Sequence, residues 1–183
     1  MRKAVVVLVL VAIVGAAVAL VVTARPDLNE TRDATETAWT PLVEPLDARY
    51  AALAVLATQT EAALEATDEG TIDQAALRVA LGRWRSAEKA DDAQKMVATA
   101  NDLEARVGQL RAVLNASIRL SQTPEVSDAR TAFDQTAAPA ELVAAYNEAV
   151  RRYQRTREST ARRLVAQVFD YGPIPTFEPS LAT

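Results

Sequence analysis

The chain has 183 residues, with 24 acidic against 20 basic side chains and neither cysteine nor histidine. The two missing residue types exclude disulfides, metal or haem ligation by His or Cys, and catalysis by a Ser-His or Cys-His pair. The acidic balance argues against a nucleic-acid partner.

The N-terminus combines two basic residues with a long apolar segment. Arg2 and Lys3 precede an uncharged apolar run over residues 4–22, and the next charge is Arg25. A helix needs about 20 apolar residues to cross a bilayer core, whereas the apolar part of a signal peptide has about 7–15. We expect a retained transmembrane helix, with cleavage near residues 22–24 as the alternative. Positive charge favours the cytoplasmic side, so the N-terminus should be cytoplasmic and the body extracytoplasmic, at the cell membrane.

The first helix of the body should cover residues 27–67. Its apolar positions repeat at alternating steps of four and three, a heptad seam that packs against other helices. These positions are Trp39, Val43, Leu46, Tyr50, Leu53, Ala57, Thr60 and Leu64. Pro41 and Pro45 lie inside this helix, where proline removes a hydrogen bond and clashes with the preceding turn, so we expect a kink or a restart.

The next helical region should cover residues 72–120, after a turn at residues 68–70. Thr71 and Gln74 have the spacing of a capping box at its start. Its later half has a second seam, formed by Met96, Ala100, Leu103, Val107, Leu110, Leu114 and Ser117. The polar residues 88–95 leave two alternatives: a break with Asp91 or Asp92 as a new cap, or a continuous solvated helix.

Two further helices and a tail complete the chain. Thr123 and Pro124 should begin a short helix that ends near Ala137. The last long helix should cover residues 140–170. Its seam is Leu142, Tyr146, Ala149, Tyr153, Thr156, Thr160, Leu164 and Val168. The tail, residues 171–183, contains a glycine and three prolines and should be extended.

These elements predict an all-α protein, because no segment alternates as a strand does. The predicted order is an N-terminal transmembrane anchor over residues 1–25, an elongated antiparallel four-helix bundle over residues 26–170, and an extended proline-rich tail over residues 171–183.

Several motifs of the chain resemble those of the bacterial LemA family. Residues 146–153 read YNEAVRRY, similar to the family's YNxAVxxYN, and residues 164–169 read LVAQVF, where the family carries LVA and a later F. Smaller matches are AWT at residues 38–40, TP at residues 123–124, GP at residues 172–173 and FE at residues 177–178. The residues that carry the resemblance are Trp39, Leu46, Arg49, Tyr146, Asn147, Val150, Tyr153 and Phe169.

The resemblance implies a membrane helix followed by an outward helical bundle, and it implies no catalytic or cofactor-binding residue. The chain departs from the family pattern at Gln154, where a second asparagine is usual. Arg157, Thr160 and Ala161 replace an apolar residue and an FP pair. Without that proline, we expect the last helix to run straighter than in typical members.

Two charged clusters are candidate binding surfaces. Five acids surround the first turn and could offer oxygen ligands to calcium or magnesium, although a solvated helix tip is the alternative. They are Glu61, Glu65, Asp68, Glu69 and Asp73. The last helix is basic and could face lipid or an acidic partner, or pair with acids on neighbouring helices. Its arginines are Arg151, Arg152, Arg155, Arg162 and Arg163, together with Arg157.

The aromatic residues Trp39, Tyr146 and Tyr153 are interpreted as core packing with tethered hydroxyls, and a ligand cage is the alternative. The sequence thus favours a non-catalytic scaffold or interaction module that needs no cofactor. Its expected partners are membrane lipid, through the N-terminal helix, and a protein whose identity the sequence does not give. A surface sensor of a ligand or divalent ion is the second hypothesis, and an enzyme that works through carboxylates alone is the third.

Overall fold

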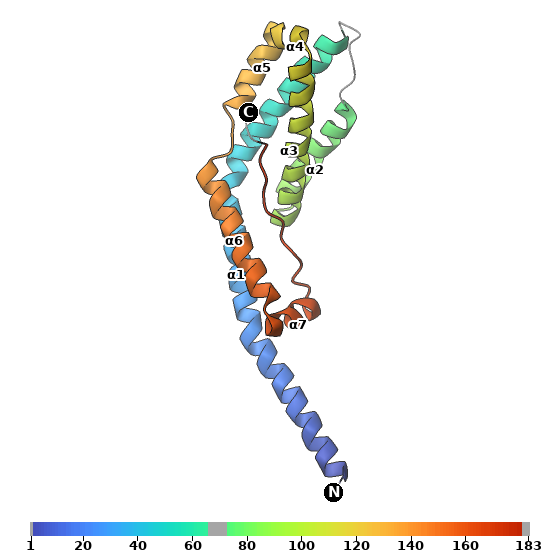
Figure 1. Ribbon diagram of the computed structural model, residues 1–183, viewed down its shortest axis with the longest axis vertical. Coiled ribbons are helices and arrows are strands. Elements are labelled where there is room, and N and C mark those ends of the chain that lie inside the picture. Colours follow the sequence, from blue (N-terminus) through green and yellow to red (C-terminus); the bar gives the residue numbers. More distant parts are fainter. Residues whose placement is uncertain (1, 66–72, 181–183) are drawn as a thin grey trace. The chain divides into compact units, whose positions relative to one another are not determined.

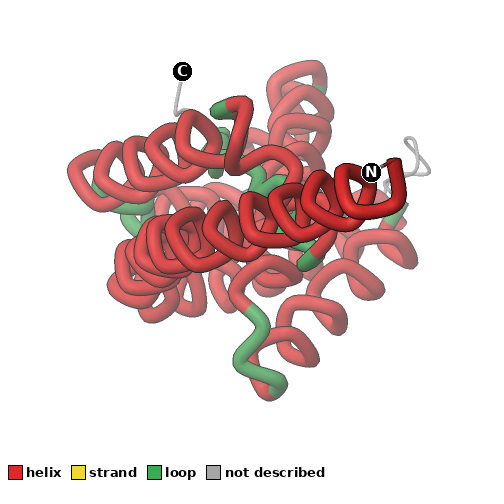
Figure 2. The backbone as a smooth tube through the Cα atoms, turned by 90° about the horizontal axis from the view of Figure 1, so that it is seen from below, coloured by secondary structure: helices red, strands yellow, loops and turns green. Residues whose placement is uncertain are grey.

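The computed structural model describes residues 2–65 and 73–180, and within them only the backbone of residues 2–14, 16, 17, 160 and 161. Seven helices occur in these residues. They are α1 (Arg2–Glu65), α2 (Gln74–Lys89), α3 (Ala93–Ala116), α4 (Ile118–Gln122), α5 (Pro124–Asp134), α6 (Ala140–Glu158) and α7 (Thr160–Val168). The described residues contain no strand, which confirms the all-α class (Figure 2).

Among the residues that the structure describes, no helix is both long enough and apolar enough to cross a membrane.

The chain divides into two compact units, Met1–Thr37 with Glu148–Ile174, and Ala38–Asn147 with Pro175–Thr183. Helices α1 and α6 each contribute residues to both units, and so does the tail. In the order given, they are the first unit and the second unit.

The second unit has a core of heptad positions from α1 and α3. Every predicted seam residue from Leu46 to Leu64 is buried, and so are those from Met96 to Leu114. Helices α2 and α3 pack against each other, as do α3 with α4 and α4 with α5 (Figure 1). Trp84 of α2 and Phe133 of α5 complete this core.

The connection between α2 and α3 decides between the two alternatives for residues 88–95. The helix breaks, and Asp92 caps α3 by accepting a hydrogen bond from the backbone N–H of Lys95 at 3.0 Å. Asp91 has φ of 50°, in the left-handed region that Asp tolerates better than most residues. The start of α2 is capped by Asp73, whose carboxylate accepts from the N–H of Ala76 at 2.9 Å. The predicted cap Thr71 lies outside the described residues.

Helix α1 corrects the predicted restart at Pro41 and Pro45, because it is helical through both prolines. Thr37 and Pro41 are exposed, so water can satisfy the Thr37 carbonyl that Pro41 leaves without its helical donor. On the opposite side, Leu42 and Leu46 are buried. Burial of this face stabilises a continuous helix against the local cost of proline.

The predicted helix over residues 140–170 is also wrong, because it ends at Glu158 and a new helix begins at Thr160. Ser159 between them is extended, with φ of −61° and ψ of 138°, and its hydroxyl donates to the Thr156 carbonyl at 3.0 Å. The break turns α7 so that Val165 and Ala166 are buried. Leu164 and Val168, predicted in the seam, are exposed, so the expectation of a straighter last helix does not hold.

The first unit is organised around the packing of α7 on α1. Val165, Ala166 and Tyr171 form a buried cluster with Ala24 and Leu28 of α1. The last part of α6 belongs to this unit as well, and residues 171–180 of the tail are non-helical, as predicted. Residues 181–183 lie outside the described part of the tail.

Two helix ends differ from the prediction in smaller ways. The region predicted as one helix to residue 120 ends at Ala116, and Ser117 caps the short α4 by accepting from the Leu120 N–H at 3.3 Å. Helix α5 begins at Pro124 as predicted but ends at Asp134, three residues before the predicted end.

Candidate functional site

Side-chain hydrogen bonds in the second unit hold tail residues 175–180. Asn147 of α6 donates its amide to the Phe177 carbonyl at 2.9 Å and accepts from the Phe177 N–H at 2.8 Å. Asn101 of α3 pairs in the same way, with the Thr176 carbonyl at 2.8 Å and the Glu178 N–H at 3.0 Å. Two asparagine side chains therefore supply hydrogen bonds to N–H and carbonyl groups of the tail, which is non-helical and pairs with no strand among the described residues.

An aromatic cluster fixes the same part of the tail. Tyr146 donates its hydroxyl to the Pro175 carbonyl at 2.9 Å. The Trp39 ring meets the Tyr146 ring edge-on, with centroids 5.0 Å apart, and the Phe177 ring at 5.7 Å. All three side chains are buried, and burial raises the pKa of Tyr146 above its ordinary value. The cluster is a filled core, as expected from the sequence. The Trp39 Nε1 has no hydrogen-bond partner among the residues that the structure describes.

A buried ion pair stands next to the tail. The Arg49 guanidinium donates to both oxygens of Glu104, at 2.7 and 2.9 Å, and the two side chains are 2% and 1% exposed. The same carboxylate accepts from the Ser180 N–H at 2.9 Å. Arg49 also stacks over the Phe133 ring, 4.2 Å from its centroid. The Glu104 carboxylate is thus used to hold Arg49 in the core and the Ser180 N–H of the tail.

The buried side chains of Tyr50 and Trp84 form a second group in this unit with the half-buried Asp47. The Trp84 indole donates to Asp47 at 2.6 Å, and the Tyr50 hydroxyl lies 3.4 Å from the Ala100 carbonyl. The Tyr50 and Trp84 rings meet edge-on with centroids 4.9 Å apart. Burial is the main cause that raises the pKa of Tyr50 well above its usual range, and the negative charge of Glu104 is the second cause.

The first unit holds its own part of the tail by the same means. Tyr153 donates to the Gly172 carbonyl at 2.8 Å, Gln154 to the Ile174 carbonyl at 3.1 Å, and Arg157 to the Tyr171 carbonyl at 2.8 Å. Burial raises the pKa of Tyr153. Gln154 thus also bonds the tail.

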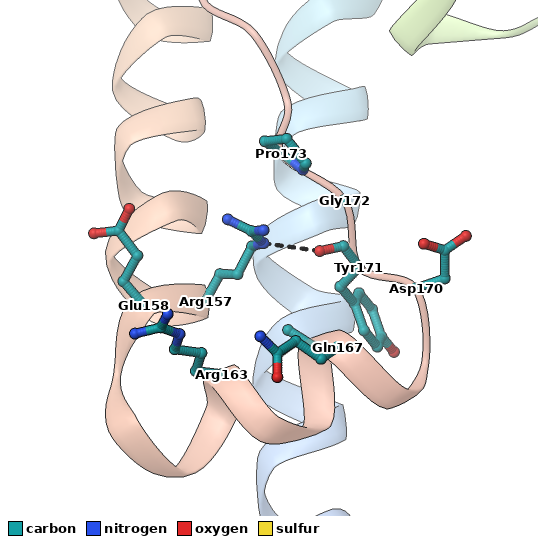
Figure 3. A pocket seen from close by; sticks show the side chains of 9 residues that line it. Arg157, Glu158, Arg163, Gln167, Asp170, Tyr171, Gly172 and Pro173 are labelled. Carbon is teal, nitrogen blue, oxygen red and sulfur yellow. Dashed lines mark hydrogen bonds between the residues drawn. The ribbon is translucent and has the colours of Figure 1, made fainter.

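A pocket of about 700 Å³ opens in the first unit beside α7 (Figure 3). Figure 3 shows Arg157 bonded to the tail and the side chains of Arg163 and Gln167 on the side of α7 that faces the pocket. Glu158 and Asp170 contribute carboxylates to the lining. Charges of both signs but no histidine, cysteine or serine line this pocket, so it offers ion pairing rather than nucleophilic chemistry.

The arginines of the last helices are mostly paired. Arg151 and Arg155 bind Glu148 at 3.0 and 2.9 Å. These two guanidinium groups lower the pKa of Glu148, first through its bond to Arg155. In the first unit Arg162 also pairs with Asp27 of α1, and Arg152 lies 3.9 Å from Glu30. Arg162 and Arg152 thus pair with acids of a neighbouring helix, as that alternative expects, whereas Arg151 and Arg155 pair within α6. Arg163, exposed at the pocket, has no ion pair among the described residues.

The other motif residues have packing positions. Leu46 and Val150 are completely buried. Phe169 is 40% exposed, and the Arg25 guanidinium lies 5.0 Å from its ring centroid.

The acidic turn is divided among separate partners. Glu61 accepts both bonds from Arg78 at 3.0 Å, and Asp73 caps α2. Asp68 and Glu69 lie outside the described residues. Within the part of the chain that the structure describes, no three carboxylates are close enough to hold a metal ion.

Sequence reasoning missed Asn101 and Glu104, the α3 residues that hold the tail. Glu104 directly follows the seam residue Leu103, and an acidic residue at the edge of a seam is the sequence signal that would have pointed to it. Asn101 has the same relation to Ala100. Their partners are more than seventy residues away in sequence, so no local pattern links them to the tail.

Searches of family models, of curated proteins and of solved structures found no match to this chain.

Proposed function

We propose that this protein is a membrane-anchored, extracytoplasmic helical scaffold of the LemA type, which acts by binding other macromolecules and not by catalysis. The observation that supports a scaffold most directly is that the polar side chains of the motifs form bonds within the protein. Tyr146, Asn147 and Tyr153 hydrogen-bond to backbone of the tail, and Arg49 is paired with Glu104. These four motif side chains are engaged in holding the chain together.

The anchor rests on the sequence of residues 4–22 and on the charges beside it. Arg2 and Lys3 lie on one side of this run, while Arg25 on the other side is soon followed by acids. This asymmetry puts the N-terminus in the cytoplasm and the body outside. The finer architecture that we propose is an antiparallel four-helix bundle followed by the extended tail. The heptad seams and the short connection between α2 and α3 support it.

The orientation can be tested in intact cells, because the native chain has no cysteine. A membrane-impermeant maleimide should label Ile118→Cys, at a side chain that is 74% exposed, and should not label Lys3→Cys until the cells are lysed. Labelling of both positions, or of Lys3→Cys alone, would contradict the proposed topology.

The scaffold role itself is tested by proximity labelling. A labelling enzyme fused to the C-terminus should repeatedly enrich the same few envelope proteins over a control that carries only residues 1–25 and the enzyme. Equal recovery from both fusions would argue against a specific partner. Turnover of a small molecule by the purified chain, lost in a Glu or Asp variant that keeps its fold, would favour the carboxylate enzyme instead.

A further inference from the structure

Helix α7 exposes apolar side chains that the heptad pattern predicts to be buried. Leu164 is 60% exposed, Val168 is 77% exposed and Phe169, directly after the helix, is 40% exposed. Leu164 and Val168 are four residues apart and therefore share one face of the helix. Single exposed apolar residues are ordinary, but three in six consecutive positions form a ridge.

The other side of α7 fixes where this ridge lies on α1. Val165 and Ala166 are buried against Ala24 and Leu28, and Leu20 and Val21 pack at the edge of the same cluster. Arg162 of α7 pairs with Asp27. The ridge is thus carried at residues 20–28 of α1, where the apolar run of residues 4–22 ends.

Helix α1 also exposes apolar side chains near its contact with α7. Val18 and Val22 are 56% and 65% exposed and, four residues apart, share a face of α1. Cations stand beside the apolar groups: Arg25 lies over Phe169, and Arg163 is exposed one residue before Leu164.

Helix α7 lies across α1 instead of running alongside it (Figures 1 and 3). Arg163 and Gln167 face the pocket, and Leu164 and Val168 lie on a face one residue step, about 100°, around the helix. A short helix that crosses a membrane span at its end lies in the plane of the interface, with an apolar face toward the acyl chains and a polar face toward water.

We propose that α7 is an interfacial helix, with Leu164, Val168 and Phe169 inserted into the outer leaflet beside the point where α1 leaves it. Arg25 and Arg163 are placed to reach lipid phosphates while the apolar parts of their side chains remain in the interface. The partner of this surface is a phospholipid headgroup layer. The inference deepens the proposed function and rests on the anchor.

The test uses the full chain reconstituted in phospholipid vesicles. Single-cysteine variants Leu164→Cys and Val168→Cys carry an environment-sensitive fluorophore, with Gln167→Cys as the control on the polar side of the same helix and Ile118→Cys as an exposed apolar control in the other unit. Lipids with quenchers at different depths should place the labels at residues 164 and 168 about 5–10 Å inside the headgroup boundary. Water-soluble iodide should quench the control labels several-fold more strongly.

Flotation of the vesicles separates the two proposals. If the protein does not float with the vesicles, the anchor fails and this inference fails with it. If it floats but iodide quenches residues 164 and 168 as strongly as residue 167, the anchor stands and the interfacial helix is wrong. Protection from both iodide and lipid quenchers would assign the ridge to protein contact, which also overturns the proposal.

Discussion

At the residue scale, the buried charged side chains are used in folding. Arg49 and Glu104 form a bidentate pair that is almost fully desolvated, and the carboxylate also holds the N–H of Ser180. Removing one member of such a pair leaves an uncompensated charge in the core. The pair therefore defines a strong test of its structural role.

We predict that Arg49→Met and Glu104→Leu each lower the free energy of unfolding by about 3–5 kcal/mol. The double variant should lose less than the sum of the two, because it leaves no unpaired buried charge. The measurement is a double-mutant cycle by urea denaturation of the full chain in mild detergent. The exposed pair Arg32–Glu36 is the matched control and should couple by less than about 1 kcal/mol. Simple additivity at Arg49 and Glu104 would contradict the account.

Trp39 gives a second prediction at this scale, since its side chain is buried against Tyr146 and Phe177. Trp39→Ala should lower the free energy of unfolding by about 3–5 kcal/mol. Trp39→Phe should cost less, because the indole Nε1 has no hydrogen-bond partner to lose. Thermal or urea unfolding measures both, and an Ala variant as stable as the Phe variant would refute the packing role.

The buried tyrosines predict a fall in stability at alkaline pH. The pKa of Tyr50 and that of Tyr146 are raised in the folded protein above the ordinary value of 10.0. The contribution of these tyrosines to the free energy of unfolding is complete below pH 10. Above pH 10 the tyrosines of the unfolded chain lose protons that those of the folded chain keep. The free energy of unfolding should then decrease by about 1.4 kcal/mol per pH unit for each such tyrosine. Unfolding at pH 8–11 measures this slope, and an unchanged slope in Tyr146→Phe would show the prediction to be wrong.

At the scale of single elements, α1 keeps two prolines inside a continuous helix. Pro41 is exposed, and its ring costs helix stability without contributing to the core. Pro41→Ala should therefore raise the free energy of unfolding, by up to about 3 kcal/mol. Ala51→Gly, at an exposed position of the same helix, is the control and should lower it by about 1 kcal/mol. Loss of stability in Pro41→Ala would mean that the proline is required by the helix path.

The sequence predicted the elements whose position follows from a local pattern, and it missed those that depend on tertiary packing. The seams of α1 and α3 were predicted except at Val43 and Ser117, which are half-buried, because a heptad repeat needs only one buried face. The break at Ser159 was missed because no glycine or proline marks it, and the seam was extended through Leu164 and Val168. Packing of Val165 and Ala166 on α1 is a tertiary effect that periodicity does not contain.

In the candidate site, too, part of the arrangement was predicted from the sequence and part was not. Tyr146, Asn147 and Tyr153 were identified from the sequence, but their partners were not. Those partners are backbone groups of the tail, from Gly172 to Phe177, and backbone carries no sequence signal. The tail was predicted to be extended from its prolines, while its attachment through Asn101 and Glu104 followed only from the fold.

For the whole molecule, we propose a membrane anchor that is joined to a body whose polar groups hold its own tail. An interfacial α7 and a scaffold role both depend on the N-terminal run staying in lipid. The most direct measurement is alkaline carbonate extraction of native membranes, followed by intact-mass analysis of the protein. We predict that the chain stays in the membrane pellet with residues 1–25 still attached. Release into the carbonate supernatant, or a mass that lacks the opening segment, would contradict the central claim.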